Sequence, residues 1–348
     1  MTRRFTVVAS GDFLRADGTP AFPEFDFRPL QEHPDIEFGF LTPAETIHPG
    51  QIAGADALVL SGARIAADSF SETVRLALIA QFGAGFDHID LAAATRHGVA
   101  VANTPSGVRR PVAVSILTLM FALTTNLMIK SRLVREGAAG WAAVTQHNGV
   151  GLVDKTLGSI GLGNIGAELF TLARPLDMNF LAHDPYASPA RARELGVELV
   201  DLPRLFRDSD ILCVNAPLTV GTRHLVNAER LALMKPTAYL INTARGGIVD
   251  QQALTAALSG RRIAGAGLDV FDPEPPDPAD PLFALDNVVL TPHALCWTDQ
   301  LSAGCGRAAV AAVLDLLAGR PPADVINREV LDLELWRGKL QRLTNGGA

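Results

Sequence analysis

A glycine-rich stretch near the middle of the chain constrains its fold more than any other part. Residues 156–160 are short and apolar, as expected of a buried strand, and the glycine-rich residues 161–166, GLGNIG, follow directly. Residues 167–173 are good helix formers, and a second apolar run, 179–182, leads into His183-Asp184. The order strand, glycine turn, helix, strand and acid predicts the first half of a dinucleotide-binding fold.

Each residue of this motif has an expected physical task. Gly161 is predicted to form the tight turn, Gly163 to let the backbone approach a pyrophosphate, and Gly166 to let the helix pack closely on the strand. The helix that follows is expected to offer phosphate its unpaired N–H groups and positive dipole end, and Asn164 and Ile165 of the glycine-rich stretch are predicted to bind the cofactor too. These five residues are therefore predicted to bind the dinucleotide.

The acid at the end of the second strand indicates which dinucleotide is bound. Asp184 lies 18 residues beyond Gly166, where a carboxylate accepts hydrogen bonds from the ribose hydroxyls and repels a 2′-phosphate. The sequence favours NAD over NADP, because Pro185-Tyr186 follows with no arginine directly beside the acid. Arg191 and Arg193, a few residues further on, leave the degree of preference open.

Bulk properties narrow the class of protein. A length of 348 residues suits two domains, and 48% hydrophobic with 19% charged residues is typical of a well-cored soluble protein. The net charge of −7 argues against nucleic acid or an anionic membrane as the partner. The three cysteines lack metal-site spacing, so no metal is predicted and reduced thiols in the cytoplasm are expected. We expect no signal peptide and no apolar run as long as a membrane span.

Strand and helix patterns alternate along most of the chain. The resulting fold prediction is an α/β protein with two doubly wound parallel-sheet domains, a Rossmann NAD-binding domain inserted into a flavodoxin-like substrate domain. We place the substrate domain at 1–106, the NAD-binding domain at 107–297 and the returning helix and tail at 298–348. The NAD-binding domain is expected to have six strands, and an apolar helix over 112–129 is expected to lie between domains or subunits.

Polar side chains follow several predicted strands of the second domain, where ligands bind in open parallel sheets. Arg245 offers a bidentate clamp for a carboxylate, and His293 can exchange a proton near neutral pH. Glu274 would orient that imidazole and raise its pKa if the two are hydrogen-bonded. Taken singly, each also has an ordinary interpretation: a solvated arginine, an exposed acid in a proline-rich loop, and a histidine that caps a turn.

From about residue 76 to 299 the chain resembles the D-isomer-specific 2-hydroxyacid dehydrogenases. The resemblance is carried by the following segments: FGAGFDHIDLAAATRHGVAVANTP, KTLGSIGLGNIG, HDPY, NAPLTVGTRHLVN, LINTARGGIVD, GAGLDVFDPEPP and LTPHALCW. It implies NAD-dependent interconversion of a 2-oxo acid and a D-2-hydroxy acid, as in glyoxylate and hydroxypyruvate reductases and phosphoglycerate dehydrogenases. It also implies a cleft between two domains and a homodimer built largely on the NAD domains.

The resemblance assigns roles to single residues. It implies that Arg245 binds the substrate carboxylate and 2-oxo oxygen, that His293 is the acid/base, and that Glu274 is its partner. It implies that the backbone amides of Ala84 and Gly85 bind the carboxylate. The remaining residues that it places around the cofactor are Ala216, Pro217, Thr222, Thr243, Ala244 and Asp269, the last holding the nicotinamide carboxamide.

The sequence departs from the family pattern around the expected substrate site. The inter-domain helix reads Val112-Ala113-Val114-Ser115 where Ala-Glu is common, and the basic pair Arg109-Arg110 precedes it. We hypothesise that Arg109 or Arg110 recognises a second anionic or polyhydroxylated end of the substrate; a surface pair near a hinge is the alternative. Segment 294–297 replaces a small, glycine-rich one, and its Trp297 is interpreted either as a substrate wall or as an inter-domain anchor.

Two other functions share this fold. Some relatives are NAD-sensing corepressors, in which binding matters more than turnover, and phosphonate dehydrogenases have the same architecture. Glu274 argues against formate dehydrogenase, which has glutamine at the equivalent position. The sequence leaves open which 2-hydroxy acid is used and the direction of the reaction in the cell.

Overall fold

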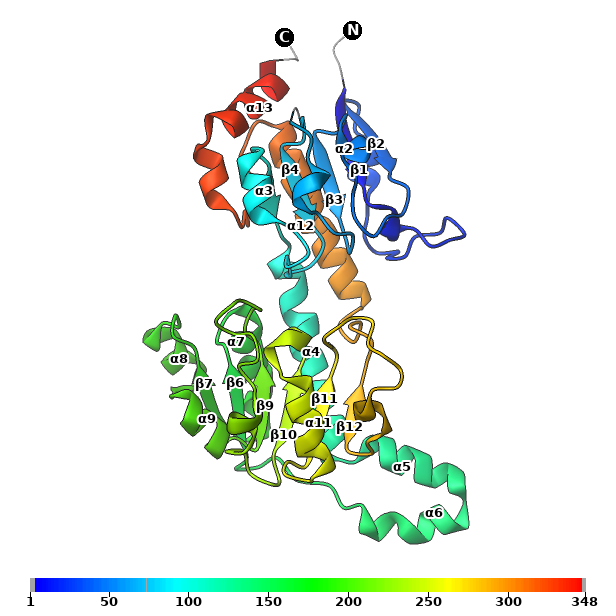
Figure 1. The fold of residues 1–348 in the computed structure, drawn as a ribbon, viewed down its shortest axis with the longest axis vertical. Coiled ribbons are helices and arrows are strands. Elements are labelled where there is room, and N and C mark those ends of the chain that lie inside the picture. Colours follow the sequence, from blue (N-terminus) through cyan, green and yellow to red (C-terminus); the bar gives the residue numbers. More distant parts are fainter. Residues whose placement is uncertain (1–3, 73, 346–348) are drawn as a thin grey trace. The chain divides into compact units, whose positions relative to one another are not determined.

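The computed structural model describes residues 4–72 and 74–345 and divides into two units. Met1–Val108 and Trp297–Ala348 form the first, and Arg109–Cys296 form the second (Figure 1). Both units contain an all-parallel sheet with helices on its faces, so the predicted α/β class with two doubly wound sheets is confirmed.

The first sheet has five strands in the order β2-β1-β3-β4-β5, which is the flavodoxin-like order. Every residue of β3 and β4 is buried, because central strands of a parallel sheet are covered on both faces. The strands are β1 Phe5–Ala9, β2 Ile36–Phe40, β3 Ala57–Leu60, β4 Leu78–Gln81 and β5 Ala100–Ala102. The helices are α1 Arg28–Gln31, α2 Pro49–Ile52, α3 Leu91–Arg96, α12 Asp299–Leu317 and α13 Glu334–Asn345.

The second sheet has seven strands in the order β12-β11-β10-β9-β6-β7-β8. They are β6 Thr156–Ile160, β7 Asn179–His183, β8 Glu198–Leu199, β9 Ile211–Val214, β10 Tyr239–Asn242, β11 Gly265–Leu268 and β12 Val288–Leu290. The chain reverses direction across the sheet between β6 and β9, the point at which such sheets bind ligands. The sequence predicted six strands; β8 was missed because two residues carry no readable alternation.

The helices of the second unit are α4 Pro105–Thr124, which begins in the first unit, α5 Leu127–Leu133, α6 Ala138–Ala143, α7 Asn164–Ala173, α8 Pro189–Leu195, α9 Leu202–Asp208, α10 Ala228–Leu231 and α11 Gln251–Ser259. Helices α4, α5 and α6 precede the first strand of the second unit, and its later helices lie between its strands. Helix α4 packs directly on β11, since a Cβ added to Gly267 would lie 3.0 Å from Leu119 Cβ. The predicted helix over 112–129 therefore starts earlier and ends at Thr124, before Asn126 with its left-handed φ of 56°.

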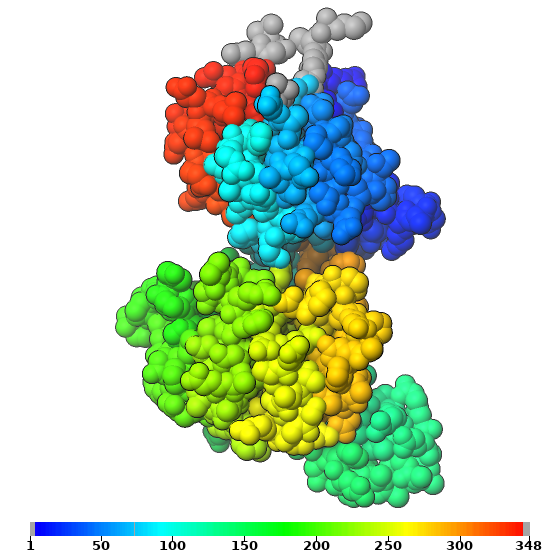
Figure 2. Space-filling model, viewed as in Figure 1, coloured from blue at the N-terminus to red at the C-terminus, as the bar shows by residue number. Residues whose placement is uncertain are grey.

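Helices α5 and α6 form an arm, residues 127–143, that extends away from the sheet of the second unit (Figure 1). Figure 2 shows this arm as a lobe that stands out from the rest of that unit. Its side chains are largely solvent-exposed, and Trp141 keeps 72% of its surface accessible. Most of the surface of the arm is therefore not covered by other parts of the same chain.

Two helices correct an expectation about membranes. The sequence was expected to contain no apolar run as long as a membrane span, but α4 and α12 are long and apolar enough to form one. Most of each apolar window is buried inside the fold, 67% in α4 and 56% in α12. Burial of this kind is typical of core helices, for which the membrane criteria are met by length and composition alone.

The C-terminal helix α13 is held on the first unit by two buried polar side chains. Trp336 donates its indole N–H to the carbonyl of Ala77 at 3.0 Å. Lys339 is 3% exposed, and its Nζ donates to the carbonyls of Leu76 and His97 at 2.7 and 2.6 Å. Burial, with a smaller contribution from Arg342, lowers the pKa of Lys339 from 10.5 to about 7.

This buried lysine predicts a pH-dependent stability. Between pH 7 and 10.5 the unfolded chain keeps the Lys339 proton that the folded chain loses, so the free energy of unfolding should rise with pH across that window. One pKa unit corresponds to about 1.4 kcal/mol, so the rise is at most about 5 kcal/mol. Urea unfolding at pH 6.5 and 9.5 measures it, and Lys339→Met should lose this rise. An equal rise in both proteins would contradict the assignment to Lys339.

Candidate active site

The three glycines of the turn between β6 and α7 occupy different environments. Gly161 has φ of 98°, and a Cβ there would lie 2.8 Å from the carbonyl oxygen of Asn215. A Cβ on Gly166 would lie 2.6 Å from the carbonyl oxygen of Gly161, so the helix rests against the turn. At Gly163 a Cβ would meet nothing within 4 Å. The turn is tight, its helix is closely packed, and its backbone is open at Gly163, which fits a dinucleotide pyrophosphate.

Two further features of this turn suit a dinucleotide. Helix α7 begins at Asn164, and Gly163 gives its N-terminus no side-chain cap, so a bound phosphate could take the place of a capping group. Asp184 accepts from the backbone N–H of Leu162 at 2.8 Å and from that of Tyr186 at 2.9 Å. These bonds fix the carboxylate beside the glycine turn, where a ribose is expected.

The loops after β9 and β10 contain the other residues predicted to bind the cofactor. Ala216 and Pro217 follow β9, and Thr222 closes that loop by donating its hydroxyl to the carbonyl of Pro217 at 2.6 Å. Thr243 and Ala244 follow β10. Within the described part of the chain, the hydroxyl oxygen of Thr243 is buried and has no hydrogen-bond partner, which fits a site completed by a bound molecule.

Asn242 is a supporting residue that the sequence analysis missed. It is buried at the end of β10, where its side-chain amide donates to the carbonyl of Arg245 at 3.0 Å and accepts from the N–H of Ala244 at 3.0 Å. Its own carbonyl accepts from the N–H of Asp269 at 3.0 Å. One side chain thus shapes the loop that presents Arg245. A polar residue at the end of an apolar strand was the available signal.

Glu274 and His293 are in direct contact. His293 Nδ1 lies 2.7 Å from Glu274 Oε2, and the other carboxylate oxygen accepts from the backbone N–H of Phe271 at 2.9 Å. Burial raises the pKa of Glu274, but the hydrogen bonds from His293 and Phe271 and the charges of His293 and Arg245 outweigh it, so the pKa is lowered. The acid is therefore ionised at neutral pH, as an orienting partner of an imidazole must be.

Asp269 holds the loop that presents His293. Its carboxylate is 2% exposed and accepts from the Thr291 hydroxyl at 2.7 Å and from the N–H groups of Ala294 and Leu295 at 3.1 and 3.2 Å. Between these anchors His293 adopts a left-handed φ of 54°. The geometry assigns Asp269 a positioning contact with this loop, alongside its predicted contact with the nicotinamide carboxamide.

The loop of Arg245 rests on the loop of Glu274. Arg245 is half-buried, and its Nη1 donates to the carbonyl of Ala244 at 2.7 Å. A Cβ added to Gly246 would lie 1.9 Å from the carbonyl oxygen of Phe271, so only glycine permits this approach. Contact between these loops, together with the Glu274–His293 bond, brings the three predicted catalytic residues into neighbouring loops of the second unit.

Ala84 and Gly85 lie in the first unit, in the turn that follows β4. Gly83 donates its N–H to the Thr104 hydroxyl at 2.8 Å, and the Asn103 amide donates to the carbonyl of Ala84 at 2.8 Å. Among residues 4–72 and 74–345, no protein acceptor is present for the N–H of Ala84 or of Gly85. The carbonyl of Ala84 is thus engaged, while the N–H groups of Ala84 and Gly85 remain available to an anion.

The basic pair near the hinge has a partner within the second unit. Arg109 Nε lies 3.1 Å from one oxygen of Glu168 on α7, and Arg110 Nε lies 2.7 Å from the other, although this second contact is not aligned as a hydrogen bond. The Glu168 side chain is only 9% exposed. The two arginines therefore connect the start of α4 to α7, the helix that follows the glycine turn. The hypothesis that Arg109 contacts substrate stays a prediction.

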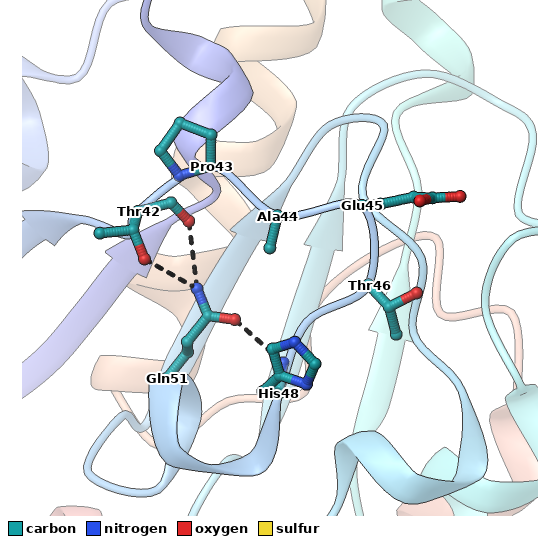
Figure 3. Close-up of a pocket in the computed structure, with 7 residues that line it drawn as sticks. All are labelled: Thr42, Pro43, Ala44, Glu45, Thr46, His48 and Gln51. Atoms are coloured by element: carbon teal, nitrogen blue, oxygen red, sulfur yellow. Dashed lines mark hydrogen bonds between the residues drawn. The ribbon is translucent and has the colours of Figure 1, made fainter.

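A surface cavity of about 580 Å³ lies in the first unit. The residues that line it are distant in the sequence from the predicted site residues described above. It is lined by the loop after β2 and by α2: Thr42, Pro43, Ala44, Glu45, Thr46, His48 and Gln51 (Figure 3). Gln51 donates to the carbonyl and hydroxyl oxygens of Thr42 at 3.1 and 3.3 Å and accepts from the N–H of His48 at 2.9 Å. These bonds close the loop, so we interpret the cavity as structural.

Across the described residues, no cluster of three or more His, Cys, Asp or Glu side chains could hold a metal.

Comparisons with known proteins agree with this arrangement. Residues 117–294 match the family model "D-isomer specific 2-hydroxyacid dehydrogenase, NAD binding domain". A glyoxylate reductase of Korarchaeum cryptofilum is 35% identical over 318 residues, covering 90% of this chain and 96% of that protein. A D-3-phosphoglycerate dehydrogenase of Methanocaldococcus jannaschii is 36% identical over 301 residues, covering 86% of this chain but only 56% of that longer protein.

The fold is also found among solved structures. The TT0316 protein of Thermus thermophilus superposes with a TM-score of 0.79 at 31% identity, covering 92% of this chain and all of that one. Sequence, fold and the geometry of the glycine turn all agree. The chain therefore belongs to the D-isomer specific 2-hydroxyacid dehydrogenases, a family of NAD-binding oxidoreductases.

Proposed function

We propose that the protein reduces a 2-oxo acid to a D-2-hydroxy acid, and catalyses the reverse reaction, with NAD(H) as the cofactor and His293 as the acid/base. The observation that carries the proposal is the 2.7 Å bond between His293 Nδ1 and Glu274 Oε2. That bond leaves Nε2 of the imidazole to face a substrate and holds the ring in one orientation. Reduction of a carbonyl group needs one proton at its oxygen, and a histidine paired with a carboxylate can donate that proton.

The other residues orient the substrate and stabilise its charge. Arg245 binds the carboxylate and the 2-oxo oxygen, where a guanidinium offers paired donors. The N–H groups of Ala84 and Gly85 bind the same carboxylate, which their lack of protein acceptors among the described residues supports. NADH supplies the hydride for the carbonyl carbon. His293 in its protonated form delivers the proton from Nε2 to the oxygen, and Glu274 compensates the imidazolium charge.

The direct test is the rate of NADH oxidation with a panel of 2-oxo acids, including glyoxylate, hydroxypyruvate, sugar-derived and aromatic members. Turnover with one class of 2-oxo acid supports the proposal and shows what size of substrate side chain the protein accepts. NADH binding without turnover on any member would reject it in favour of the corepressor-like sensor or another reaction such as phosphonate oxidation. The prediction for Arg109 or Arg110 is tested in the same assay, because unchanged KM values for anionic and polyhydroxylated 2-oxo acids in both Arg109→Ala and Arg110→Ala would reject it.

We propose NAD rather than NADP as the cofactor. Asp184 supports this, because its carboxylate is fixed beside the glycine turn by two backbone N–H groups and would face a 2′-phosphate. Asp184→Ala removes the hydrogen bonds to the ribose and the repulsion of phosphate. Hydrogen bonds to charged groups are worth about 1.5–3 kcal/mol, so we expect kcat/KM for NADH to fall about 10- to 100-fold while that for NADPH rises. A wild-type preference for NADPH would contradict the assignment.

We propose that the protein is a homodimer joined through its second unit. Nine of the fourteen large apolar side chains that are exposed in the described residues lie between 114 and 153, on α4, the arm and the segment after it: Val114, Phe121, Leu127, Met128, Val134, Trp141, Val144, Val150 and Val153. An exposed apolar surface of this extent is typical of an interface. Light scattering should give a dimer mass, and Met128→Glu with Trp141→Glu should give a monomer, whereas Leu333→Glu should not. A wild-type monomer would reject the proposal. We also propose a cytoplasmic location, where the three cysteines would stay reduced.

A further inference from the structure

Three aromatic side chains of the first unit form a continuous row that begins at the proposed carboxylate-binding turn. Phe82 directly precedes Gly83-Ala84-Gly85 in the chain. Its ring lies 4.7 Å from the ring of Phe22, which in turn contacts the Trp297 indole edge-on at 5.1 Å and 70°. We call these three residues the aromatic row. It joins segments that are far apart in the sequence at one place beside the turn.

Buried rings support the aromatic row from behind. Phe13 is 2% exposed and contacts Phe22 at 6.0 Å and Phe82 at 5.9 Å. Phe25 is also buried, and its ring lies 5.7 Å from that of Phe82. Helix α12 comes close to the same segment, since a Cβ on Gly306 would lie 3.2 Å from Phe25 Cα. Ring pairs at these distances are mutually stabilising, so the row is held in a defined position.

The end of the row at Trp297 is exposed. Trp297 keeps 56% of its surface accessible, whereas Phe22, which contacts it, keeps 8%. Its position is nevertheless fixed, because it directly precedes Thr298, whose hydroxyl accepts from the N–H of Leu301 and caps α12. A well-anchored, half-exposed indole is a surface on which an apolar group gains free energy by excluding water.

We propose that the aromatic row forms the wall against which the side chain of the 2-oxo acid packs, so that the preferred substrates carry an aromatic or large apolar side chain. This inference rests on the proposed function, in which the N–H groups of Ala84 and Gly85 hold the carboxylate. The substrate side chain then extends from that turn along Phe82 and Phe22 to Trp297. A 2-oxo acid with no side chain, such as glyoxylate, leaves the indole uncovered and gains nothing from it.

Steady-state kinetics with phenylpyruvate and glyoxylate test the proposal. The wild-type protein should have the higher kcat/KM for phenylpyruvate. Trp297→Ala should lower kcat/KM for phenylpyruvate about tenfold or more, mainly through KM, because one aromatic contact in a pocket contributes about that much. The value for glyoxylate should stay within about twofold, and Trp297→Phe should retain most of the wild-type preference.

The matched control is Phe40→Leu. Phe40 contacts Phe27 and Phe38 in the same group of rings but does not contact the three members of the row, so this variant reports general loosening of the aromatic core. It should leave both kcat/KM values near wild type. An equal loss for phenylpyruvate and glyoxylate in Trp297→Ala would overturn the proposal, and so would a wild-type preference for glyoxylate.

A binding measurement separates this proposal from the proposed function. Calorimetric titration of the wild-type protein and Trp297→Ala, each with NAD present, with phenylpyruvate and with glyoxylate needs no turnover. Tighter phenylpyruvate binding that is lost in Trp297→Ala supports the aromatic row even if neither acid is reduced, in which case only the proposed reaction fails. Equal binding of phenylpyruvate by both proteins would reject the row whatever the turnover.

Discussion

Replacing His293 with alanine is expected to lower kcat for 2-oxo acid reduction by about two to four orders of magnitude, the range over which a positioned acid/base contributes. The dissociation constant for NADH should change little, because the glycine turn and Asp184 that are proposed to bind it lie elsewhere in the second unit. Stopped-flow or steady-state rates with NADH, alongside NADH titration by fluorescence, provide both numbers.

Glu274→Gln is the matched variant for His293→Ala. Glutamine keeps the size of the side chain and can keep its contact with the imidazole, but it removes the negative charge that faces the imidazolium. We expect a smaller loss of kcat than in His293→Ala. Because the pKa of Glu274 is lowered from 4.5, its protonation limits the wild-type rate only below that value, and Glu274→Gln should lose this acid limb. Near-normal turnover in His293→Ala would remove His293 from the mechanism, and loss of NADH binding would instead indicate a damaged fold.

The glycine turn gives the second prediction with a large effect, and substitutions at two of its glycines distinguish steric exclusion of the cofactor from disruption of the helix packing. Gly163→Ala adds a methyl group that meets no protein atom within 4 Å, so the melting temperature should not change. If the pyrophosphate lies over Gly163, the same methyl group occupies its space. Overpacking of this kind costs about 1–3 kcal/mol, which corresponds to a rise of about 5- to 150-fold in the dissociation constant for NADH.

Gly166→Ala should affect both properties. Its Cβ would lie 2.6 Å from the carbonyl oxygen of Gly161, so the helix and turn must separate. Both the melting temperature and NADH affinity should fall, by differential scanning fluorimetry and fluorescence titration respectively. Gly163→Ala with unchanged NADH affinity would show that the pyrophosphate does not occupy the space over Gly163. A Gly166→Ala protein with wild-type stability would contradict the packing.

Much of the fold could be predicted from the sequence because its evidence is local. Apolar runs of strand length, glycine turns and the acid after β7 each follow from neighbouring residues, and so the two parallel sheets were expected. Local patterns also failed in a physical way. The two-residue β8 is too short to alternate, and the apolar composition of α4 does not reveal whether protein or lipid covers it.

The chemistry of the second unit was predicted in part. The sequence placed Arg245, Glu274 and His293 after different strands, and parallel strand ends meet at one edge of a sheet. The 2.7 Å contact between Glu274 and His293, and the support that Asn242 and Asp269 give to their loops, depend on how those loops pack. No periodicity in the sequence reports such packing, because each loop's conformation is decided by hydrogen bonds to another loop.

The sequence by itself determined the fold class, the dinucleotide turn and the residue types of the reaction, because local spacing and backbone requirements specify them. Only the tertiary structure decided the partners of side chains that are distant in the chain. Glu168 pairs with Arg109 and Arg110, Lys339 reaches the carbonyl of Leu76, and Trp297 contacts Phe22. These contacts arise when separate elements bury their apolar surfaces together, and the free energy of that packing is a property of the whole arrangement rather than of any one segment.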